Sequence, residues 1–408
     1  MKKRRTRVRL LLPISIALAP AACIDDPVRP PSDPGAEAQL AVAAGSAAVD
    51  LRMVAEGRRT FRFDDFGDWR LWTDVLRLNE LVEGVSPATA LSLGLKVDSD
   101  AVPAEVLAAV LSDPALLDDP AVTRALLSLD AVVGLRATVE GDRISRIGIT
   151  CALCHSTVDD AVAPGIGERL DGWPNLDLEV GTIISLTPGL PDELRATYAA
   201  WLTGFFDPRF NVDGISDPVV IPPAYGLAQA GLETYTAEGP ISYWNNYVAV
   251  VEMGGHGSFR DPRLGIDIRV PPAEDEVRDK LAPLRKYQRT LEAPAPPQGS
   301  FDPEAAEEGR VVFETVGRCA DCHTGPALGG GGRVHAPAAT GMDPTYAERG
   351  TTGGYRATPL RGLWQHAPYF HDGSATTLSD VVEHYDAYLD LGLSVDEKRV
   401  LLAYLASL

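Results

Sequence analysis

Two copies of one short motif carry the clearest chemistry in this chain of 408 residues. Two cysteines three positions apart can each form a thioether with one vinyl group of a haem, and a histidine directly after them can reach the iron. A zinc ribbon needs no such histidine, and a redox-active cysteine pair needs a thioredoxin-like βαβ context. The motifs therefore predict two covalently attached haems c. They are Cys151-Ala-Leu-Cys154-His155 and Cys319-Ala-Asp-Cys322-His323, with His155 and His323 as the proximal iron ligands.

The fifth cysteine, Cys23, ends an N-terminal segment that predicts export. Basic residues over positions 2–9 precede an apolar run over positions 10–22, which is too short to span a bilayer. The Ala-Ala-Cys sequence ending at Cys23 resembles a bacterial lipoprotein signal, in which the cysteine becomes acylated, although Pro20 stands where such signals usually carry Leu. Plain secretion is the alternative. We expect a signal peptide over 1–22 and a periplasmic, membrane-tethered lipoprotein.

The composition excludes some functions. The chain is 45% hydrophobic, which is enough for a sizeable core in one large or two medium domains. Its formal net charge is −20, and beyond the first 22 positions it holds 31 basic against 57 acidic residues. Such a charge argues against binding nucleic acid or anionic lipid headgroups through a general electrostatic surface. We expect no nucleic-acid partner, and contact with the membrane only through the N-terminal lipid anchor.

Sequences downstream of the two motifs repeat in diverged form. Pro223-Ala-Tyr-Gly-Leu, 68 residues after His155, is echoed by Pro359-Leu-Arg-Gly-Leu, 36 residues after His323. The first half therefore carries an insertion of about 32 residues relative to the second.

The residues before each motif add a prediction of the fold. Gly309 and Phe313, ahead of the second motif, lie on one helical face and resemble the opening helix of class I cytochromes c. Residues 143–150 stand in the corresponding place before the first motif. We therefore predict a mainly α fold with few short strands, built from two tandem class I cytochrome c-like domains that each bind one haem c.

Composition places the domain boundaries. Prolines cannot continue a helix, so the proline-rich segment 292–300 is predicted to be a stiff linker. Helical apolar spacing over 102–133 is broken by two prolines and predicts a helical lead-in. The predicted segments are a signal peptide at 1–22, a disordered tether at 23–48, the lead-in and first cytochrome c domain at 49–291, the linker at 292–300 and the second cytochrome c domain at 301–408.

A long stretch of the second half carries a family resemblance. Residues 355–378, Tyr-Arg-Ala-Thr-Pro-Leu-Arg-Gly-Leu-Trp-Gln-His-Ala-Pro-Tyr-Phe-His-Asp-Gly-Ser-Ala-Thr-Thr-Leu, resemble the signature of the bacterial di-haem cytochrome c peroxidase and MauG superfamily. The resemblance implies a periplasmic oxidoreductase in which the C-terminal haem relays electrons and the N-terminal haem meets the oxidant. It also implies hydrogen peroxide as oxidant, a small redox protein as electron donor or acceptor, and a catalytic part for the signature histidine, His371.

Members of this family differ in the residue fourteen positions after the signature histidine, which binds the far side of the C-terminal iron. It is a methionine in the peroxidases and a tyrosine in the MauG-like branch, and here it is Tyr385. An anionic phenolate lowers the reduction potential of iron and favours storage of oxidising equivalents. His384 is the main rival, but neighbouring residues on a helix point about 100° apart, so only one can face the iron. Met342 is a third candidate, and core packing is an alternative role for Tyr385.

The first half contains a shortened counterpart of another family stretch, over residues 243–253. The resemblance implies that Trp244 lies between the haems and that Glu252 is a distal acid, which can exchange a proton with peroxide. A ligand from Met253 or His256 would instead cap the first iron and make the protein a non-enzymatic electron carrier. A di-haem oxygenase that uses O2 is a third alternative, and it needs an apolar channel to the first haem.

Relatives of this family also hold calcium between the haems. The run Asn211-Val-Asp213-Gly214 has calcium-binding residue types, so calcium stays open as a further cofactor. Arg209 occupies a position where an EF-hand loop needs a carboxylate, and no glutamate closes the loop. The sequence therefore assigns no metal ligand beyond those of iron.

Overall fold

The computed structural model describes the backbone of residues 34–408 and the side chains from residue 49 onward. Residues 49–408 form one compact unit. The expected signal peptide at 1–22 and the expected lipid-modified Cys23 lie outside the described residues. Within the described part of the chain, no helix is both long and apolar enough to cross a membrane.

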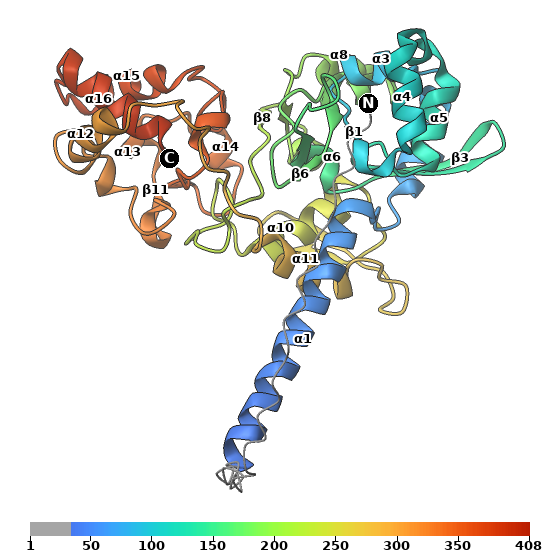
Figure 1. Ribbon diagram of the computed structural model, residues 1–408, viewed down its shortest axis with the longest axis horizontal. Coiled ribbons are helices and arrows are strands. Elements are labelled where there is room, and N and C mark those ends of the chain that lie inside the picture. Colours follow the sequence, from blue (N-terminus) through green and yellow to red (C-terminus); the bar gives the residue numbers. More distant parts are fainter. Residues whose placement is uncertain (1–33) are drawn as a thin grey trace, which may run out of the picture. The chain divides into compact units, whose positions relative to one another are not determined.

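The first helix differs from the sequence prediction. Helix α1 (Pro34–Phe63) begins inside the segment expected to be a disordered tether, so positions 34–48 are helical (Figure 1). Seven of the residues in 35–48 are alanine, the best helix former, and none is proline. The prediction of disorder rested on the Ala- and Pro-rich composition of residues 24–45, whereas the prolines of that stretch end at Pro34, where the helix begins.

Short helices joined by long loops make up most of the first half of the chain. They are α2 (Leu78–Glu83), α3 (Pro87–Ser92), α4 (Ala104–Ser112), α5 (Pro120–Ser128), α6 (Ala152–His155), α7 (Val180–Leu186), α8 (Asp192–Ala199), α9 (Phe210–Asp213), α10 (Ile241–Tyr247) and α11 (Leu281–Gln288).

The strands are few and short, and every sheet within the described residues has two strands. This agrees with the few short strands that the sequence predicts. The parallel pair is β1 (Val97–Asp98) with β5 (Ile166–Gly167). The antiparallel pairs of the first half are β2 (Leu135–Glu140) with β3 (Arg143–Ile149), β4 (Ser156–Val158) with β6 (Arg169–Asp171), β7 (Phe205–Phe206) with β8 (Val219–Val220), and β9 (Phe259–Asp261) with β10 (Ile266–Ile268).

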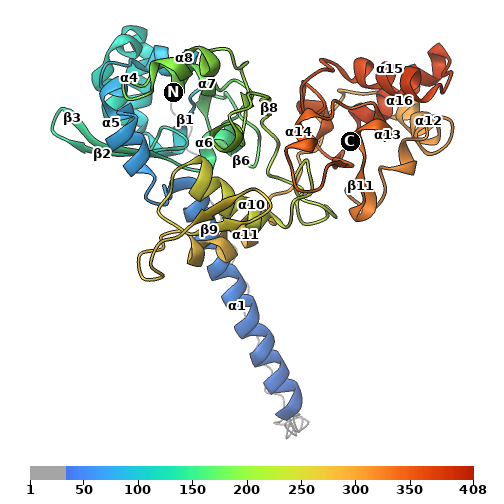
Figure 2. The same ribbon diagram turned by 180° about the vertical axis from the view of Figure 1, so that it is seen from behind.

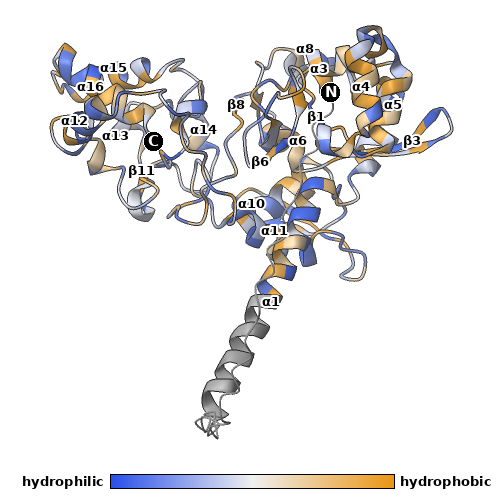
Figure 3. Ribbon diagram, viewed as in Figure 1, coloured by the Kyte–Doolittle hydropathy of each residue, from blue (hydrophilic) through white to orange (hydrophobic). Residues whose placement is uncertain are grey.

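The expected lead-in is helical and breaks at its prolines. Helix α4 is followed by a 3-10 turn that begins at Pro114, and α5 begins at Pro120. Each proline stands in the first turn, where a missing N–H costs nothing, and Asp113 and Asp119 cap the two elements with their carboxylates. Figure 3 shows many hydrophobic residues on α4 and α5. The core that these helices cover continues into the β2–β3 hairpin, where Ile147 is fully buried.

The second half contains three helices of 12 residues each, α12 (Pro303–Glu314), α15 (Leu378–Leu389) and α16 (Val395–Ala406). Figures 1 and 2 show that the elements of residues 301–408 lie close together in space. The others are α13 (Pro337–Thr340) and α14 (Thr345–Glu348), with β11 (Val334–His335) paired to β12 (Tyr355–Arg356).

Helices α12 and α16 cross closely at a glycine. A Cβ on Gly309 would overlap the carbonyl oxygen of Val400 and would lie 2.9 Å from the Cβ of Tyr404. Four residues later, Phe313 is buried and packs edge-on against the ring of Tyr404, with ring centroids 5.2 Å apart. The missing side chain at Gly309 therefore lets the two helices approach and lets Phe313 pack against Tyr404.

The first half repeats this crossing with α1 and α11. A Cβ on Gly57 would overlap the carbonyl oxygen of Pro283 and would lie 2.7 Å from the Cβ of Tyr287. Phe61, four residues after Gly57, packs edge-on against Tyr287 with ring centroids 5.6 Å apart. The counterpart of α12 is thus the C-terminal part of α1, which meets α11 in Figure 2.

This repeat corrects the sequence alignment of the two halves. Residues 143–150, expected to match the opening helix, form strand β3 and its end. Phe313 precedes Cys319 by 6 residues, whereas Phe61 precedes Cys151 by 90, and the lead-in fills the difference. The hydroxyl of Thr150 donates to the carbonyl of Arg62 at 3.2 Å, which brings the end of α1 beside the first motif.

At the two crossings, we expect Gly→Ala substitutions to change the stability in the opposite direction from that at an ordinary helical position. At an open helical position, Gly→Ala stabilises by roughly 1 kcal/mol, because glycine loses more backbone freedom on folding. We expect Gly57→Ala and Gly309→Ala to destabilise instead by about 1–3 kcal/mol, because the methyl group forces the helices apart. Guanidinium unfolding of the haem-loaded protein measures the change, with Glu308→Ala, an exposed site on α12, as control. A Gly309→Ala protein as stable as the wild type would show that the crossing is not tight.

Candidate functional site

The first motif ends in the single turn α6, which presents His155. The Nδ1 atom of His155 lies 3.0 Å from the carbonyl oxygen of Pro222. Nδ1 must carry the proton to donate this bond, so Nε2 keeps its lone pair for a metal. Burial lowers the pKa of His155 to about 4, which keeps the imidazole neutral. The ring therefore has the protonation state and the fixed orientation of an iron ligand.

Residues shortly after the motif hold α6 in place. The side-chain amide of Asn175 donates to the carbonyl of Leu153 at 3.3 Å, and its backbone N–H donates to that of Cys154 at 2.9 Å. The backbone N–H of Gly172 donates to the carbonyl of His155 at 2.8 Å. These bonds satisfy carbonyl groups that a one-turn helix leaves free. The position of the cysteines and of His155 is thus fixed by the chain that follows them.

The first motif lines a largely apolar cavity of about 450 Å³, which lies within the usual range of cofactor sites of about 300–1,000 Å³. Cys151 and Cys154 are both free thiols, and burial raises the pKa of each to about 12. Two thiols and one neutral imidazole on the wall of an apolar cavity fit a covalently bound haem c, whose ring is flat and apolar. Large side chains on the other walls include Leu71, Trp72, Tyr198, Trp201, Phe206 and Trp244.

Glu252 places a carboxyl group in the same cavity. It ends a short π-helical turn over Val248–Glu252, which continues α10. Its Oε1 atom is buried and has no hydrogen-bond partner among the described residues. Burial raises the pKa of Glu252 well above its usual value, and the nearby carboxylate of Asp207 adds to the shift. The side chain of Tyr247 also interacts with this carboxyl and partly opposes the shift. An enclosed carboxyl with a raised pKa and one oxygen without a partner is suited to proton transfer.

The other predicted residues of the first site lie in different places. Trp244 lines the cavity and stacks on Tyr247, with ring centroids 5.1 Å apart. Met253 is buried and also lines the cavity. The His256 imidazole is partly exposed and faces Glu274, with 3.7 Å between Nε2 and the carboxylate. The structure therefore brings Glu252, Trp244 and Met253 together with His155, and places His256 elsewhere.

The second motif orients its histidine in the same way. The Nδ1 atom of His323 lies 2.9 Å from the carbonyl oxygen of Leu328, and the backbone of Thr358 also interacts with this imidazole. Burial lowers the pKa of His323. Thr358 directly precedes Pro359, as Pro222 directly precedes Pro223. The repeated proline therefore marks the same structural position in both halves, next to the proximal histidine.

Among the three candidates for the far side of the second iron, Tyr385 is the one placed near the motif. Burial raises the pKa of Tyr385 to about 12, and the nearby Cys322 and Cys319 contribute to the shift. His384 points elsewhere, since its Nε2 atom lies 2.9 Å from the carbonyl oxygen of Thr340. Met342 packs against a separate cluster that contains Tyr346 and Tyr355. Tyr385 therefore stays the predicted ligand, with His384 and Met342 engaged in other contacts.

His371, predicted to be catalytic, does not line the cavity of the first motif. It is buried, and its Nε2 atom lies 3.0 Å from the hydroxyl of Tyr355. Its carbonyl accepts a hydrogen bond of 2.8 Å from the backbone of Val220, two residues before Pro222. The location of His371 suits a positioning residue, because it connects the signature stretch to the segment that holds His155.

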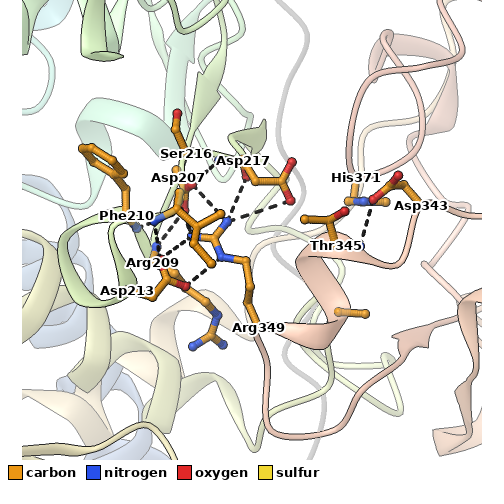
Figure 4. Close-up of polar contacts among 12 residues, drawn as sticks. Asp207, Arg209, Phe210, Asp213, Ser216, Asp217, Asp343, Thr345, Arg349 and His371 are labelled. Carbon is orange, nitrogen blue, oxygen red and sulfur yellow. Dashed lines mark hydrogen bonds and ion pairs between the residues drawn. The ribbon is translucent and has the colours of Figure 1, made fainter. Parts of the chain in front are cut away.

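The acidic residues near the calcium-like run are paired with an arginine. Figure 4 shows Arg349 of the second half among Asp207, Asp213 and Asp217 of the first. Its guanidinium nitrogens lie 2.9 Å from Asp207 and 2.8 Å from Asp213. No group of three or more metal-binding side chains is arranged around a common point within residues 49–408. A guanidinium thus occupies the place where these carboxylates would meet a cation.

Sequence reasoning missed two residues of the first site. Pro222 acts through its carbonyl group, which any residue possesses, so only its place in the proline repeat could have identified it. Arg356 lies 201 residues after His155 and nevertheless lines the same cavity. Its place within the signature stretch gave no indication of a contact with the first half.

Comparisons with known proteins identify relatives of this chain. A family model described as RoxA-like, cytochrome c-like matches residues 354–386. The chain is 34% identical over 286 residues to the cytochrome c551 peroxidase of Nitrosomonas europaea. This match covers 65% of this chain and 76% of that protein. It is 32% identical over 152 residues to the cytochrome-c peroxidase IdrP2 of Denitromonas iodatirespirans, which covers 27% of this chain and 41% of that protein. The match therefore spans less than half the length of IdrP2.

Two solved structures match parts of this chain at low overall similarity. One is a MauG-like protein associated with microbial copper homeostasis, with 20% identity, 48% of this chain and 74% of that chain covered, and a TM-score of 0.32. The other is the hydrazine synthase of Kuenenia stuttgartiensis, with 17% identity, 53% and 79% covered, and a TM-score of 0.31. The relationship rests instead on the Nitrosomonas protein, together with the two motifs and the signature. The chain belongs to the bacterial di-haem cytochrome c peroxidase and MauG superfamily, a family of peroxidase-type oxidoreductases that bind haem c.

Proposed function

We propose that the protein is a periplasmic di-haem oxidoreductase that reacts with hydrogen peroxide at the haem held by His155. Electrons pass through a second haem, held by His323. The observation that carries this proposal is the enclosed carboxyl of Glu252 in the cavity of His155, whose Oε1 atom has no hydrogen-bond partner among the described residues. The two matching helix crossings, at Gly57 and Gly309, support a haem-binding domain in each half.

A haem at His155 supplies an iron that binds a small oxidant and transfers electrons to it. Glu252 supplies the proton chemistry. Because its pKa is raised, this carboxyl keeps a proton under conditions where an ordinary glutamate is ionised. It can donate this proton to the departing oxygen of peroxide as a general acid, and the carboxylate that results can then take up the proton of the other peroxide oxygen. The apolar walls of the cavity exclude bulk water and so maintain the raised pKa.

Tyr385 is proposed as the distal ligand at the second site. Its high pKa means that the phenol ionises only when a cation such as ferric iron compensates the charge. A bound phenolate stabilises oxidised iron and so favours storage of oxidising equivalents, as in the MauG-like branch. Trp244 lies in the cavity of the first site and is proposed to line the path of the oxidant or the electron.

Aromatic contact between the halves supports electron transfer. The rings of Trp173 and Trp364 meet edge to face with centroids 5.9 Å apart. Trp173 follows Gly172, which is hydrogen-bonded to His155. On the other side, the backbone of Leu360 donates to the carbonyl of Ala327 at 3.0 Å, next to the Leu328 that holds His323. The two tryptophans therefore link the surroundings of both proximal histidines.

The location and the partner are part of the same proposal. The N-terminal segment supports export and acylation at Cys23, which would tether the protein to a membrane from the periplasmic side. A small redox protein exchanges electrons with the second haem, and the net charge of −20 favours a partner with a basic docking face.

A second candidate function is electron transfer without catalysis. Met253 lines the cavity of His155, and its thioether bound to the first iron would close the site to peroxide.

Electron paramagnetic resonance separates the two functions. At low temperature, the oxidised haem-loaded protein is expected to give a high-spin ferric signal from an open first haem and a low-spin signal from the second. Hydrogen peroxide should consume the high-spin signal. Two low-spin signals that peroxide leaves unchanged, in both the oxidised and the half-reduced protein, would contradict the enzyme and favour the electron carrier.

Replacement of Glu252 tests the proton chemistry. Glu252→Gln keeps the shape of the side chain but removes the titrating group. We expect kcat for peroxide reduction to fall roughly 10²–10⁴-fold, as for loss of a general acid–base, while the high-spin signal and the haem content stay unchanged. Glu274→Gln, at an exposed glutamate, is the matched control. Unchanged turnover in Glu252→Gln would exclude this carboxyl from catalysis.

Replacement of Tyr385 tests the distal ligand. Tyr385→Phe removes the phenolate, so we expect the low-spin signal of the second haem to disappear and its reduction potential to rise. A spectroelectrochemical titration measures the potential. Tyr388→Phe, at an exposed tyrosine on the same helix, should leave both properties unchanged, as should His384→Ala. Loss of the low-spin signal in His384→Ala alone would instead identify His384 as the ligand.

A further inference from the structure

Arg356 is a buried cation that the second half places in the first half's cavity. It ends strand β12, which lies in the signature stretch, and it is 8% exposed. It lines the same cavity as Cys151, Cys154 and His155. Its backbone N–H donates to the carbonyl of Tyr235 at 2.9 Å, which fixes the strand against the first half.

The guanidinium of Arg356 lacks a carboxylate partner. One nitrogen donates to the carbonyl of Leu232 at 2.6 Å, but Nε is buried and has no hydrogen-bond partner among the described residues. The nearby Glu233 is paired with Arg289, at 2.7 Å. Burial lowers the pKa of Arg356 to about 10, as expected for a charge that is poorly compensated.

Other buried arginines of residues 49–408 show the usual arrangement. Arg209 pairs with Glu238, and Arg349 pairs with Asp207. Buried charges are normally paired because removal from water is costly. The exception at Arg356 therefore points to an anion that belongs in the cavity.

A second unpaired group lies beside this arginine. The Nε2 atom of His366 is buried and has no hydrogen-bond partner among the described residues. Burial lowers the pKa of His366, and the positive charge of Arg356 lowers it further. Two hydrogen-bonding side chains of the signature stretch are thus unsatisfied in the same region.

We propose that Arg356 binds a propionate carboxylate of the haem held by Cys151, Cys154 and His155. This inference rests on the proposed haem in the first half. A propionate is the anionic group that a haem brings into such a cavity, and a guanidinium can hold a carboxylate with two parallel hydrogen bonds. The second half then completes the cofactor site of the first, which is a composite site.

The position of Arg356 also connects the two haems. Two residues later, the backbone of Thr358 interacts with His323, the proximal histidine of the second site. The segment 356–358 therefore contacts both cofactor sites. A fixed positive charge near the first haem favours its reduced form, which carries less positive charge on iron, so Arg356 raises the reduction potential of that haem.

Redox titration of the haem-loaded protein tests this role. Loss of the charge in Arg356→Gln should lower the reduction potential of the first haem, identified by its high-spin spectrum, and leave that of the second nearly unchanged. We expect the equilibrium constant for electron transfer between the haems to change about tenfold, which corresponds to about 59 mV for one electron. Arg361→Gln, at an exposed arginine of the same stretch, is the control and should shift neither potential.

Arg356→Lys covers the case in which Arg356→Gln does not fold. Lysine keeps the charge but cannot form the two parallel bonds, so the propionate-bending band of the first haem in the resonance Raman spectrum should move to lower frequency. An unchanged band in Arg356→Lys, or unchanged potentials in Arg356→Gln, would overturn the proposal. Haem content is measured first in the wild type, because a chain without haem at the first motif would overturn the proposed function itself.

Discussion

The orientation of His155 is the constraint on which the rest of the site depends. An imidazole is a well-defined iron ligand when its second nitrogen is held by the protein, and here the carbonyl of Pro222 holds Nδ1 at 3.0 Å. Pro222 follows strand β8, whose Val220 is hydrogen-bonded to the carbonyl of His371 in the second half. The second half therefore helps to place the ligand of the first. Glu252 and Arg356 line the same cavity as this ring, so their proposed roles depend on where the ring lies.

Charged residues also connect the two halves of the chain. The ion pair of Arg349 with Asp207 is buried and joins one half to the other. The backbone N–H of Thr351 donates to Glu238 at 2.6 Å, and Glu238 in turn pairs with Arg209. Arg349 and Arg209 thus have carboxylate partners within the protein, whereas Arg356 has none, and the Oε1 atom of Glu252 has no hydrogen-bond partner among the described residues. Both unsatisfied groups line the cavity of His155, which is where a cofactor and its substrate would supply the missing partners.

The sequence carries more information about the chemistry of the two motifs than about the elements that position them. The spacing of cysteines and histidines predicts haem attachment because covalent chemistry needs those residues at that spacing. The signature led to Tyr385, which the structure places near the second motif. The opening helix of the first half was misplaced, because its Gly57 and Phe61 lie 90 residues or more before Cys151 and only the folded chain brings them back. Backbone carbonyls such as that of Pro222 have no sequence signature, and Arg356 enters the first site only through tertiary packing.

The central claim is that each half encloses one covalently bound haem. Mass spectrometry of proteolytic peptides from the mature, exported protein tests it most directly. The account predicts two haem-modified peptides, one that contains Cys151 and Cys154 and one that contains Cys319 and Cys322. Haem on only one of the two motifs, or a disulfide within either motif of the exported protein, would contradict it.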